Sequence, residues 1–495
     1  MTTVDLAAGH SSAPLDKGLK TGALGFISSV VIGVASTAPG YSLAASLGVV
    51  AASVALRTPA ALLIAFVPMF LIAGSYYSMN RVDPDCGTTF TWVAKGIGPV
   101  TGWVAGWALL LADILVMASL SQIAGEYTFL LFGAHSLANS TFWVTVVGVI
   151  WIVLMCWICY VGIELSAQTQ WFLLAAELVT LALFAVVALI KVYNGDFHDS
   201  VRPSLSWLDP TKVSSTALTA GILTAIFIYW GWDTAVAVNE ETADAERTPG
   251  IAAVVSTLLL LGIYIVVGFA AIAVHGPQFL VAHQDEILSP LGHDVLPAGL
   301  DKLLIIAVLT SASASTQTTI LPGTRAALAM ASHGAAPKAF ASINPRRLTP
   351  GYATIWFGVI SIAYYVILTL VSQNILADSI TATGLMITFY LGMTGVACVV
   401  YFRKALFTSL RNFLLAGVGP ALGAAMMGYI FVKSAIDQFN VSNSYSGKPL
   451  LGMGAPFTIS LLGLVLGVIL MLMQWRSAPA FFRRKRESAE AGYLL

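Results

Sequence analysis

Long apolar runs follow one another along nearly the whole chain, and only short polar segments separate them. A run of about twenty apolar residues forms a helix long enough to cross the hydrocarbon core of a bilayer. The pattern therefore predicts an all-α polytopic membrane protein with twelve transmembrane helices. The expected spans are centred near Ser36, Phe70, Leu115, Ile150, Thr180, Phe227, Ile263, Ser315, Ile360, Phe389, Gly423 and Leu464.

The first and sixth runs each contain residues that do not suit a continuous membrane helix. Pro39 removes a helix hydrogen bond and clashes with the preceding turn, so the first run is expected to break there. In the sixth run Gly231 weakens the helix, and hydrocarbon opposes the charge of Asp233 by about 3 kcal/mol. Non-helical backbone at this depth is tolerated where it is buried in protein or lines a wet cavity. The two interruptions therefore predict a binding site near the middle of the membrane.

The interruptions occupy the same place in each half of the first ten spans. This symmetry predicts a five-plus-five inverted repeat with broken helices one and six, followed by two extra C-terminal helices. The expected segments are residues 1–22 as an N-terminal tail, 23–192 and 193–402 as the two repeats, 403–476 as spans eleven and twelve, and 477–495 as a basic C-terminal tail. Seventeen of the 24 Lys and Arg residues lie on one side of this topology, which predicts that both tails are cytoplasmic.

Composition excludes several classes of protein. The 495 residues are 58% hydrophobic and 10% charged with a net charge of +0, so neither a soluble enzyme nor a basic nucleic-acid-binding surface is expected. The sequence contains no phosphate-loop or dinucleotide motif, and none of its seven histidines lies at the middle of a span. The four cysteines suit small apolar packing residues. We expect no cofactor, no metal site and no enzymatic activity, and the lipid bilayer as the surrounding partner.

Carboxylates occupy two further spans. Asp113 lies near the middle of the third span and Glu177 near the middle of the fifth, far from both ends by helix rise. Each needs a partner or a proton, and a buried carboxylate that loads and releases a proton suits a proton-coupled carrier. A structural role is the alternative, for Glu177 as a hydrogen bond to a neighbouring helix. Asp233 can attract a substrate amine or cap the second half of its broken helix.

Three stretches resemble a known family of transporters. They are the sixth span with its tail, FIYWGWDTAVAVNEETADAERTPGIA, the segment after the second span, DPDCGTTFTWVAKGIGPVTGWVAGW, and the end of the eighth span, LPGTRAALAMASHGAAPKAFASINPRRLTP. Together they resemble the amino acid, polyamine and organocation (APC) superfamily of secondary transporters, over nearly the whole chain. The resemblance implies the leucine-transporter fold and transport by alternating access.

The resemblance also implies a substrate site. In that superfamily, backbone amides of the first break hold the substrate carboxylate, and carbonyls of the sixth-span break hold its amine. The carboxylate side falls on Ser36, Thr37, Ala38, Pro39 and Gly40, and the amine side falls on Phe227, Ile228 and Trp230, with Tyr229, Gly231, Trp232 and Asp233 beside them. Many members have Gly-(Ser/Thr)-Gly where this chain has Thr37, Ala38 and Pro39. Because proline has no N–H, a substrate without a carboxylate is a real alternative.

Two further positions concern the coupling ion. Glu177 lies where several members of the superfamily have a lysine that substitutes for a sodium ion, so the charge is reversed here. Hydroxyls of the eighth span supply sodium ligands in sodium-driven relatives, and Ser315 and Thr316 are the matching candidates. Such hydroxyls also hold neighbouring helices together, and a packing role is the alternative to a sodium site.

The sequence as a whole predicts a secondary active transporter in the cell membrane that imports an amino acid and is coupled to protons through Glu177 and Asp113. The alternatives are an importer of a polyamine or another organic amine, an amino-acid exchanger, and a sodium-coupled symporter. A channel or a transporter-like sensor is the alternative from another class.

Overall fold

The structure, a computed structural model, describes residues 16–283, 287–297, 299–300 and 302–495. Most of the predicted N-terminal tail, residues 1–15, lies outside the described residues. The described part is helical, with isolated bridges but no strands. It therefore confirms the all-α class that the hydropathy pattern predicts.

Within the described part of the chain, ten stretches of helix are long and apolar enough to cross a membrane. They are α1 (Phe26–Ser36), α2 (Pro39–Val54) and α3 (Thr58–Val82) taken together, α5 (Pro99–Leu131), α7 (Thr141–Val161), α8 (Ile163–Asn194), α11 (Thr248–Ala282), α13 (Lys302–Ser332), α14 (Gly351–Val371), α15 (Gln373–Phe402), α16 (Leu410–Asn412) continued by α17 (Gly419–Phe439), and α18 (Ala455–Ser477). The centre predicted at Phe227 lies in α9 (Ser215–Ile228), which has 14 residues. By helix rise α9 covers only about 21 Å, less than the hydrocarbon thickness. The count of twelve spans therefore stays a prediction.

Two of the predicted segment boundaries can be located on the helices. The boundary after residue 402 coincides with the end of α15, whereas the boundary after residue 192 lies two residues before α8 ends at Asn194. The division into two inverted repeats stays a prediction as well.

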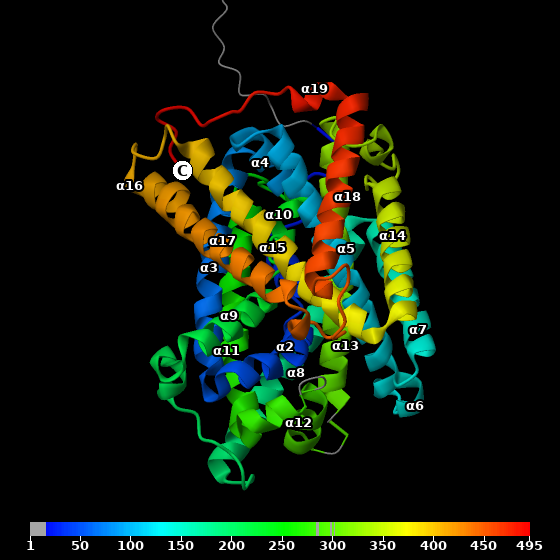
Figure 1. Cartoon of the computed structure of the whole chain (residues 1–495), viewed down its shortest axis with the longest axis vertical. Helices are drawn as coiled ribbons and strands as arrows, with labels where there is room; N and C mark the ends of the chain where they lie inside the picture. Colours follow the sequence, from blue (N-terminus) through cyan, green and yellow to red (C-terminus); the bar gives the residue numbers. More distant parts are fainter. Residues whose placement is uncertain (1–15, 284–286, 298, 301) are drawn as a thin grey trace, which may run out of the picture.

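Short helices mark the two ends of the molecule (Figure 1). At one end lie α4 (Thr89–Gly96), α19 (Pro479–Phe482) and the C-terminus, and we call this end the α4 face. At the opposite end lie α6 (His135–Ala138) and α12 (Leu288–Val295), and we call it the α12 face. In the topology predicted from Lys and Arg, the α4 face is the cytoplasmic one.

The helices α5 and α13 form the centre of the bundle. In each of them 78% of the apolar segment is buried inside the protein, against 33% for α7 and 28% for α18. The hydroxyl side chains of Ser311, Ser313, Ser315 and Thr316 in α13 are all buried. Polar groups on a central helix need partners inside the bundle, so the interior is where functional chemistry is expected.

Candidate functional site

The first predicted interruption is a helix break in the structure. α1 ends at Ser36, and α2 begins at Pro39 after two residues. Ala38 adopts the left-handed conformation, with φ 48° and ψ 65°, which costs a residue with a Cβ roughly 1–2 kcal/mol. Pro39 suits the first position of α2, because the first turn of a helix does not use its N–H groups. The chain therefore turns here without a glycine.

Side chains from two other helices bind the N–H groups that open α2. Gly40 N donates to Glu177 Oε1 of α8 at 2.6 Å, and Tyr41 N donates to Ser311 Oγ of α13 at 3.1 Å. The other donors bind the backbone, Thr37 N to Val34 O, Ala38 N to Ala35 O, and Ser42 N to Ala38 O. Since proline has no N–H, every backbone donor from residue 37 to residue 42 already has a partner within the protein.

The second predicted interruption is also present. α9 ends at Ile228, and α10 (Thr234–Ala237) follows after a series of turns. Gly231 has φ 120°, a conformation that side-chain-bearing residues rarely adopt. Tyr264 OH of α11 donates to Ile228 O at 2.7 Å and so satisfies a carbonyl at the end of α9. With only four residues, α10 is much shorter than the half-helix that precedes the break.

The two breaks are in direct contact. A Cβ added at Gly231 would lie 2.5 Å from Ser36 O, so the backbones approach as closely as glycine allows. The hydroxyls of Ser36 and Thr234 are 2.8 Å apart. From α13, Ser315 Oγ donates to Ser36 O at 3.0 Å. The sequence separates these breaks by about two hundred residues, and the fold brings them together at one place.

Asp233 belongs to a buried cluster of acidic and aromatic side chains. Tyr390 OH of α15 donates to Asp233 Oδ2 at 2.9 Å, and Trp230 Nε1 donates to Tyr390 OH at 2.5 Å. Asp113 of α5 is near enough for the two carboxylates to repel each other, and its Oδ2 has no hydrogen-bond partner among the described residues. Asp233 makes no side-chain cap on α10, so the structure does not support the capping alternative.

Aromatic rings form one wall of this cluster. Tyr76 of α3 lies beside both acidic side chains of the cluster. Its ring meets Trp92 and Trp232 edge to face, each with ring centroids 5.2 Å apart. Carboxylates beside aromatic rings are the groups that attract an organic ammonium ion.

A cavity of about 1180 Å³ lies on the α12 side of the breaks. Residues of α2, α5, α9, α15 and α17 line it, from Lys433 and Asp437 near the end of α17 to Tyr41 and Phe227 beside the breaks. Phe227, expected on the amine side, thus faces the cavity. Gly231 and Asp233 are not among the lining residues, and the Asp233 side chain is buried.

On the α4 side of the breaks, buried ion pairs connect segments distant in sequence. Lys17 Nζ binds Asp85 Oδ2 at 2.9 Å and also binds the Glu240 carboxylate. His333 Nε2 lies 3.0 Å from Asp85 Oδ2. Burial alone would raise the pKa of Asp85, but His333 and Lys17 hold it well below its usual range. Asp85 therefore stays charged and paired at neutral pH.

A second ion pair on this side is fully buried. The guanidinium of Arg325 in α13 donates from Nε and Nη2 to the two oxygens of Glu241, each at 2.9 Å. Neither side chain is exposed. Backbone bonds join the same segment to the start of α1, with Leu24 N donating to Glu241 O at 3.0 Å. Together these contacts close the α4 side beneath the second break.

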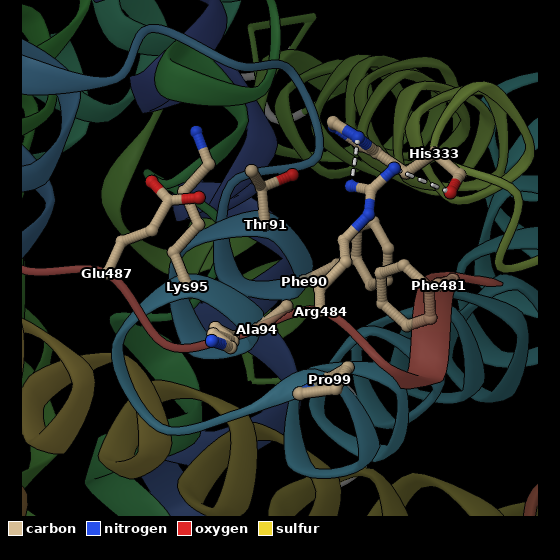
Figure 2. A pocket seen from close by; sticks show the side chains of 10 residues that line it. Phe90, Thr91, Ala94, Lys95, Pro99, His333, Phe481, Arg484 and Glu487 are labelled. Atoms are coloured by element: carbon tan, nitrogen blue, oxygen red, sulfur yellow. Dashed lines mark hydrogen bonds between the residues drawn. The ribbon is translucent and has the colours of Figure 1, made fainter. Parts of the chain in front are cut away.

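The C-terminal segment lies across this closed side (Figure 2). Arg484 Nη1 lies 3.0 Å from His333 Nδ1, and Arg484 Nη2 donates to His333 O at 3.1 Å. The Phe481 ring stacks on Phe90 of α4, with ring centroids 5.4 Å apart. Because His333 also contacts Asp85, the segment is connected through one side chain to the ion pairs beneath it.

The structure places the predicted coupling residues in different surroundings. Glu177 lies at the first break, with Oε2 lacking a hydrogen-bond partner among the described residues. Asp113 lies instead at the acidic cluster of the second break. Ser315 reaches the first break, whereas Thr316 Oγ1 donates to Ala312 O of its own helix.

Other contributors escaped sequence reasoning. They are Tyr76, Tyr264, Ser311 and Tyr390 around the breaks, and Lys17, Asp85, Glu240, Glu241, Arg325 and His333 on the α4 side. Ser311 had a signal in the hydroxyl-rich stretch of the eighth span. The three stretches that resemble the transporter family contain five more of them without indicating a role, namely Asp85, Glu240, Glu241, Arg325 and His333. The others are ordinary residue types whose partners lie far away in the sequence.

A bundle of membrane helices with two broken helices and buried charges between them is typical of secondary transporters. The family model for amino acid permeases matches residues 22–444, most of the chain, and the chain therefore belongs to the amino acid permease family within the APC superfamily. An uncharacterized transporter of Mycobacterium tuberculosis is 27% identical over 68% of this chain and 72% of its own length. The low-affinity putrescine importer PlaP of Escherichia coli is 23% identical over 81% and 86%. The branched-chain amino acid permease BcaP of Lactococcus lactis is 22% identical over 58% and 63%.

Proposed function

We propose that this permease is a secondary active transporter that imports a small solute with a protonated amine across the cell membrane by alternating access. One observation carries the proposal. The 1180 Å³ cavity reaches the breaks from the α12 side, while buried ion pairs at Lys17 and Arg325 close the α4 side. A carrier open to one side at a time requires such a one-sided path.

The predicted topology of twelve spans with both termini cytoplasmic assigns each face of the protein to one side of the membrane. Under this topology the cavity opens to the outside and the closed α4 face lies in the cytoplasm. The amine is expected to bind at the second break, where Asp233, Tyr390 and Trp230 form one hydrogen-bonded chain. An amino acid is the substrate that the sequence predicts, and an organic amine is the alternative.

Glu177 and Asp113 are the proposed proton carriers. Each is buried in the bundle and has one carboxylate oxygen without a hydrogen-bond partner among the described residues. Glu177 faces the Gly40 amide of α2, Ser311 of α13 and Tyr264 of α11, and we find no basic side chain among these contacts. Protonation would weaken its charge-assisted bond to Gly40 and so link proton uptake to the first break.

The test uses purified protein in liposomes with an imposed pH gradient and radiolabelled amines and amino acids. The wild-type protein is expected to accumulate a labelled solute above its external concentration only when the gradient is present. Accumulation separates a carrier from a channel, and a requirement for internal substrate would identify an exchanger. A protein that binds these solutes but moves none of them would be a sensor, and the proposal would be wrong.

Glu177→Gln tests the coupling itself, with Glu164→Gln as the matched control on the same helix. Glu164, near the start of α8, is 55% exposed and forms an ion pair with Lys20, away from both breaks. The Glu177 variant is expected to lose the dependence of uptake on the pH gradient, and the control to keep it. Normal gradient dependence in Glu177→Gln would remove this residue from the proton path.

A further inference from the structure

The N-terminus of α2 is already occupied by an acidic side chain of the protein. The Gly40 amide donates to Glu177 Oε1, the Tyr41 amide donates to Ser311 Oγ, and Pro39 has no N–H. The amides just before Pro39 are bound by carbonyls of α1. A substrate carboxylate arriving at this break would therefore find no free donor.

Space and charge oppose a second carboxylate at this position. A Cβ added at Gly40 would lie 3.4 Å from Glu177 Oε1, 3.4 Å from the Ser311 Cβ and 3.3 Å from Ala307 O, so α8 and α13 close around it. The partial positive charge at the start of the 16-residue helix α2 is already balanced by Glu177. A substrate anion would be placed beside a like charge in a buried site, which is strongly unfavourable.

The buried charged side chains around the breaks are all acidic. Asp113, Glu177 and Asp233 are all buried. Among the described residues, Lys17 and Arg325 are the buried basic side chains, and both are paired with other acids on the α4 side. The negative charges of Asp113 and Asp233 can therefore be balanced by protons or by a cation from outside the described chain, and a transported ammonium ion is such a cation.

We propose that Glu177 takes the place of a substrate carboxylate at the first break, and that the transported solute is a small aliphatic diamine without a carboxylate. One ammonium group would bind Asp233 beside Tyr390, and the other would bind the open oxygen of Asp113. The rings of Tyr76, Trp230 and Trp232 would cover the methylene groups between them. This inference rests on the proposed transport function and narrows its substrate.

The experiment compares solutes that differ only in a carboxylate. Putrescine and ornithine form one such pair, cadaverine and lysine another, and butylamine is the single-amine control. Liposomes with the purified full-length protein would be loaded under one pH gradient and tested for uptake of each labelled compound. Both diamines are expected to enter at least about tenfold faster than their amino-acid counterparts, since a tenfold ratio needs only about 1.4 kcal/mol.

Variants at Glu177 test whether this residue excludes carboxylates, independently of any general loss of transport activity. Glu177→Ala frees the Gly40 amide, and Glu177→Gln retains an acceptor without the charge. In Glu177→Ala the binding of ornithine relative to putrescine is expected to rise about tenfold, and in Glu177→Gln it is expected to rise less, because the Gly40 amide keeps its acceptor. Binding is measured by thermal stabilisation of the purified protein, because coupling itself can be lost. Glu164→Gln is expected to leave the ratio unchanged.

The possible outcomes distinguish a failure of the diamine inference from a failure of the proposed transport function. Uptake of ornithine or lysine at the rate of the diamine would overturn this inference while the transport function stood. Equal uptake of butylamine and putrescine would overturn the assignment of two ammonium sites. If no amine and no amino acid accumulated, the proposed function itself would be wrong.

Discussion

The α4 side of the breaks is closed by buried ion pairs, whereas the α12 side is open through a cavity. On the α4 side, the charged side chains of Lys17, Asp85, Glu241 and Arg325 are almost completely buried and bound to one another. On the α12 side, the cavity extends down to Phe227 between mostly apolar and hydroxyl-bearing side chains, and the charged residues Glu126, Lys433 and Asp437 also line it. In the proposed transport cycle, the α4 side can open only when these buried ion pairs separate.

The largest expected effect comes from breaking the fully buried pair on the closed side. Arg325→Gln leaves the charge of Glu241 buried without a partner, which typically costs about 3–5 kcal/mol. A large drop in thermal unfolding temperature is expected, with part of it recovered in the double variant Arg325→Gln, Glu241→Gln. Arg346→Gln, at an exposed position, is the control. Unchanged stability of the single variant would show that this pair does not hold the α4 side closed.

The second largest effect is expected at Gly231, where the two helix breaks are in contact. Gly231→Val places a branched side chain at φ 120° and against Ser36 O, and overpacking of this kind costs about 1–3 kcal/mol. Uptake is expected to fall at least tenfold, because the breaks can no longer approach. Gly262→Val is the control, since a Cβ at Gly262 meets no atom within 4 Å. Unaltered uptake in Gly231→Val would count against a site between the breaks.

A smaller effect is expected from removing the two ion pairs of Lys17, which lies before α1. Lys17→Gln removes the charge between Asp85 and Glu240, but His333 still contacts Asp85 and the Cys86 amide still donates to Glu240. Amide hydrogen exchange on the α4 face is expected to become several times faster, and exchange beside the cavity to stay the same. Lys20→Gln, whose partner Glu164 is exposed, serves as the control. Equal acceleration on both sides would contradict the contrast drawn between them.

The smallest effect is expected from the hydroxyl that connects α13 to the first break. Ser315→Ala removes one hydrogen bond to Ser36 O, worth about 1 kcal/mol. If protons drive transport, replacing sodium with choline should leave uptake unchanged in both the wild-type protein and Ser315→Ala. Thr316→Val, which affects only a bond within α13, is the control. Loss of uptake without sodium would make the sodium-coupled alternative correct.

The features that could be predicted from the sequence are those that depend on residues close together in the chain. Runs of apolar residues give the helices, and Pro39 and Gly231 interrupt them wherever the helices come to lie. Partners across the bundle could not be predicted, because nothing near Gly40 indicates Glu177, 137 residues away. The same is true of Lys17 and Glu240, separated by 223 residues. The short α10 also escaped prediction, since its sequence continues the apolar pattern that a longer helix would show.

Cys86 gives the closed α4 side a chemical reporter of its own. Its backbone N donates to Glu240 at 2.9 Å, its Sγ lies 3.7 Å from Arg325 O, and its side chain is completely buried. Burial also raises the pKa of the thiol, so almost none of it is the reactive thiolate. When the ion pairs around it separate, water reaches the sulfur and alkylation becomes possible. The rate at which a maleimide modifies this native cysteine would therefore measure how often the transporter turns toward the α4 side.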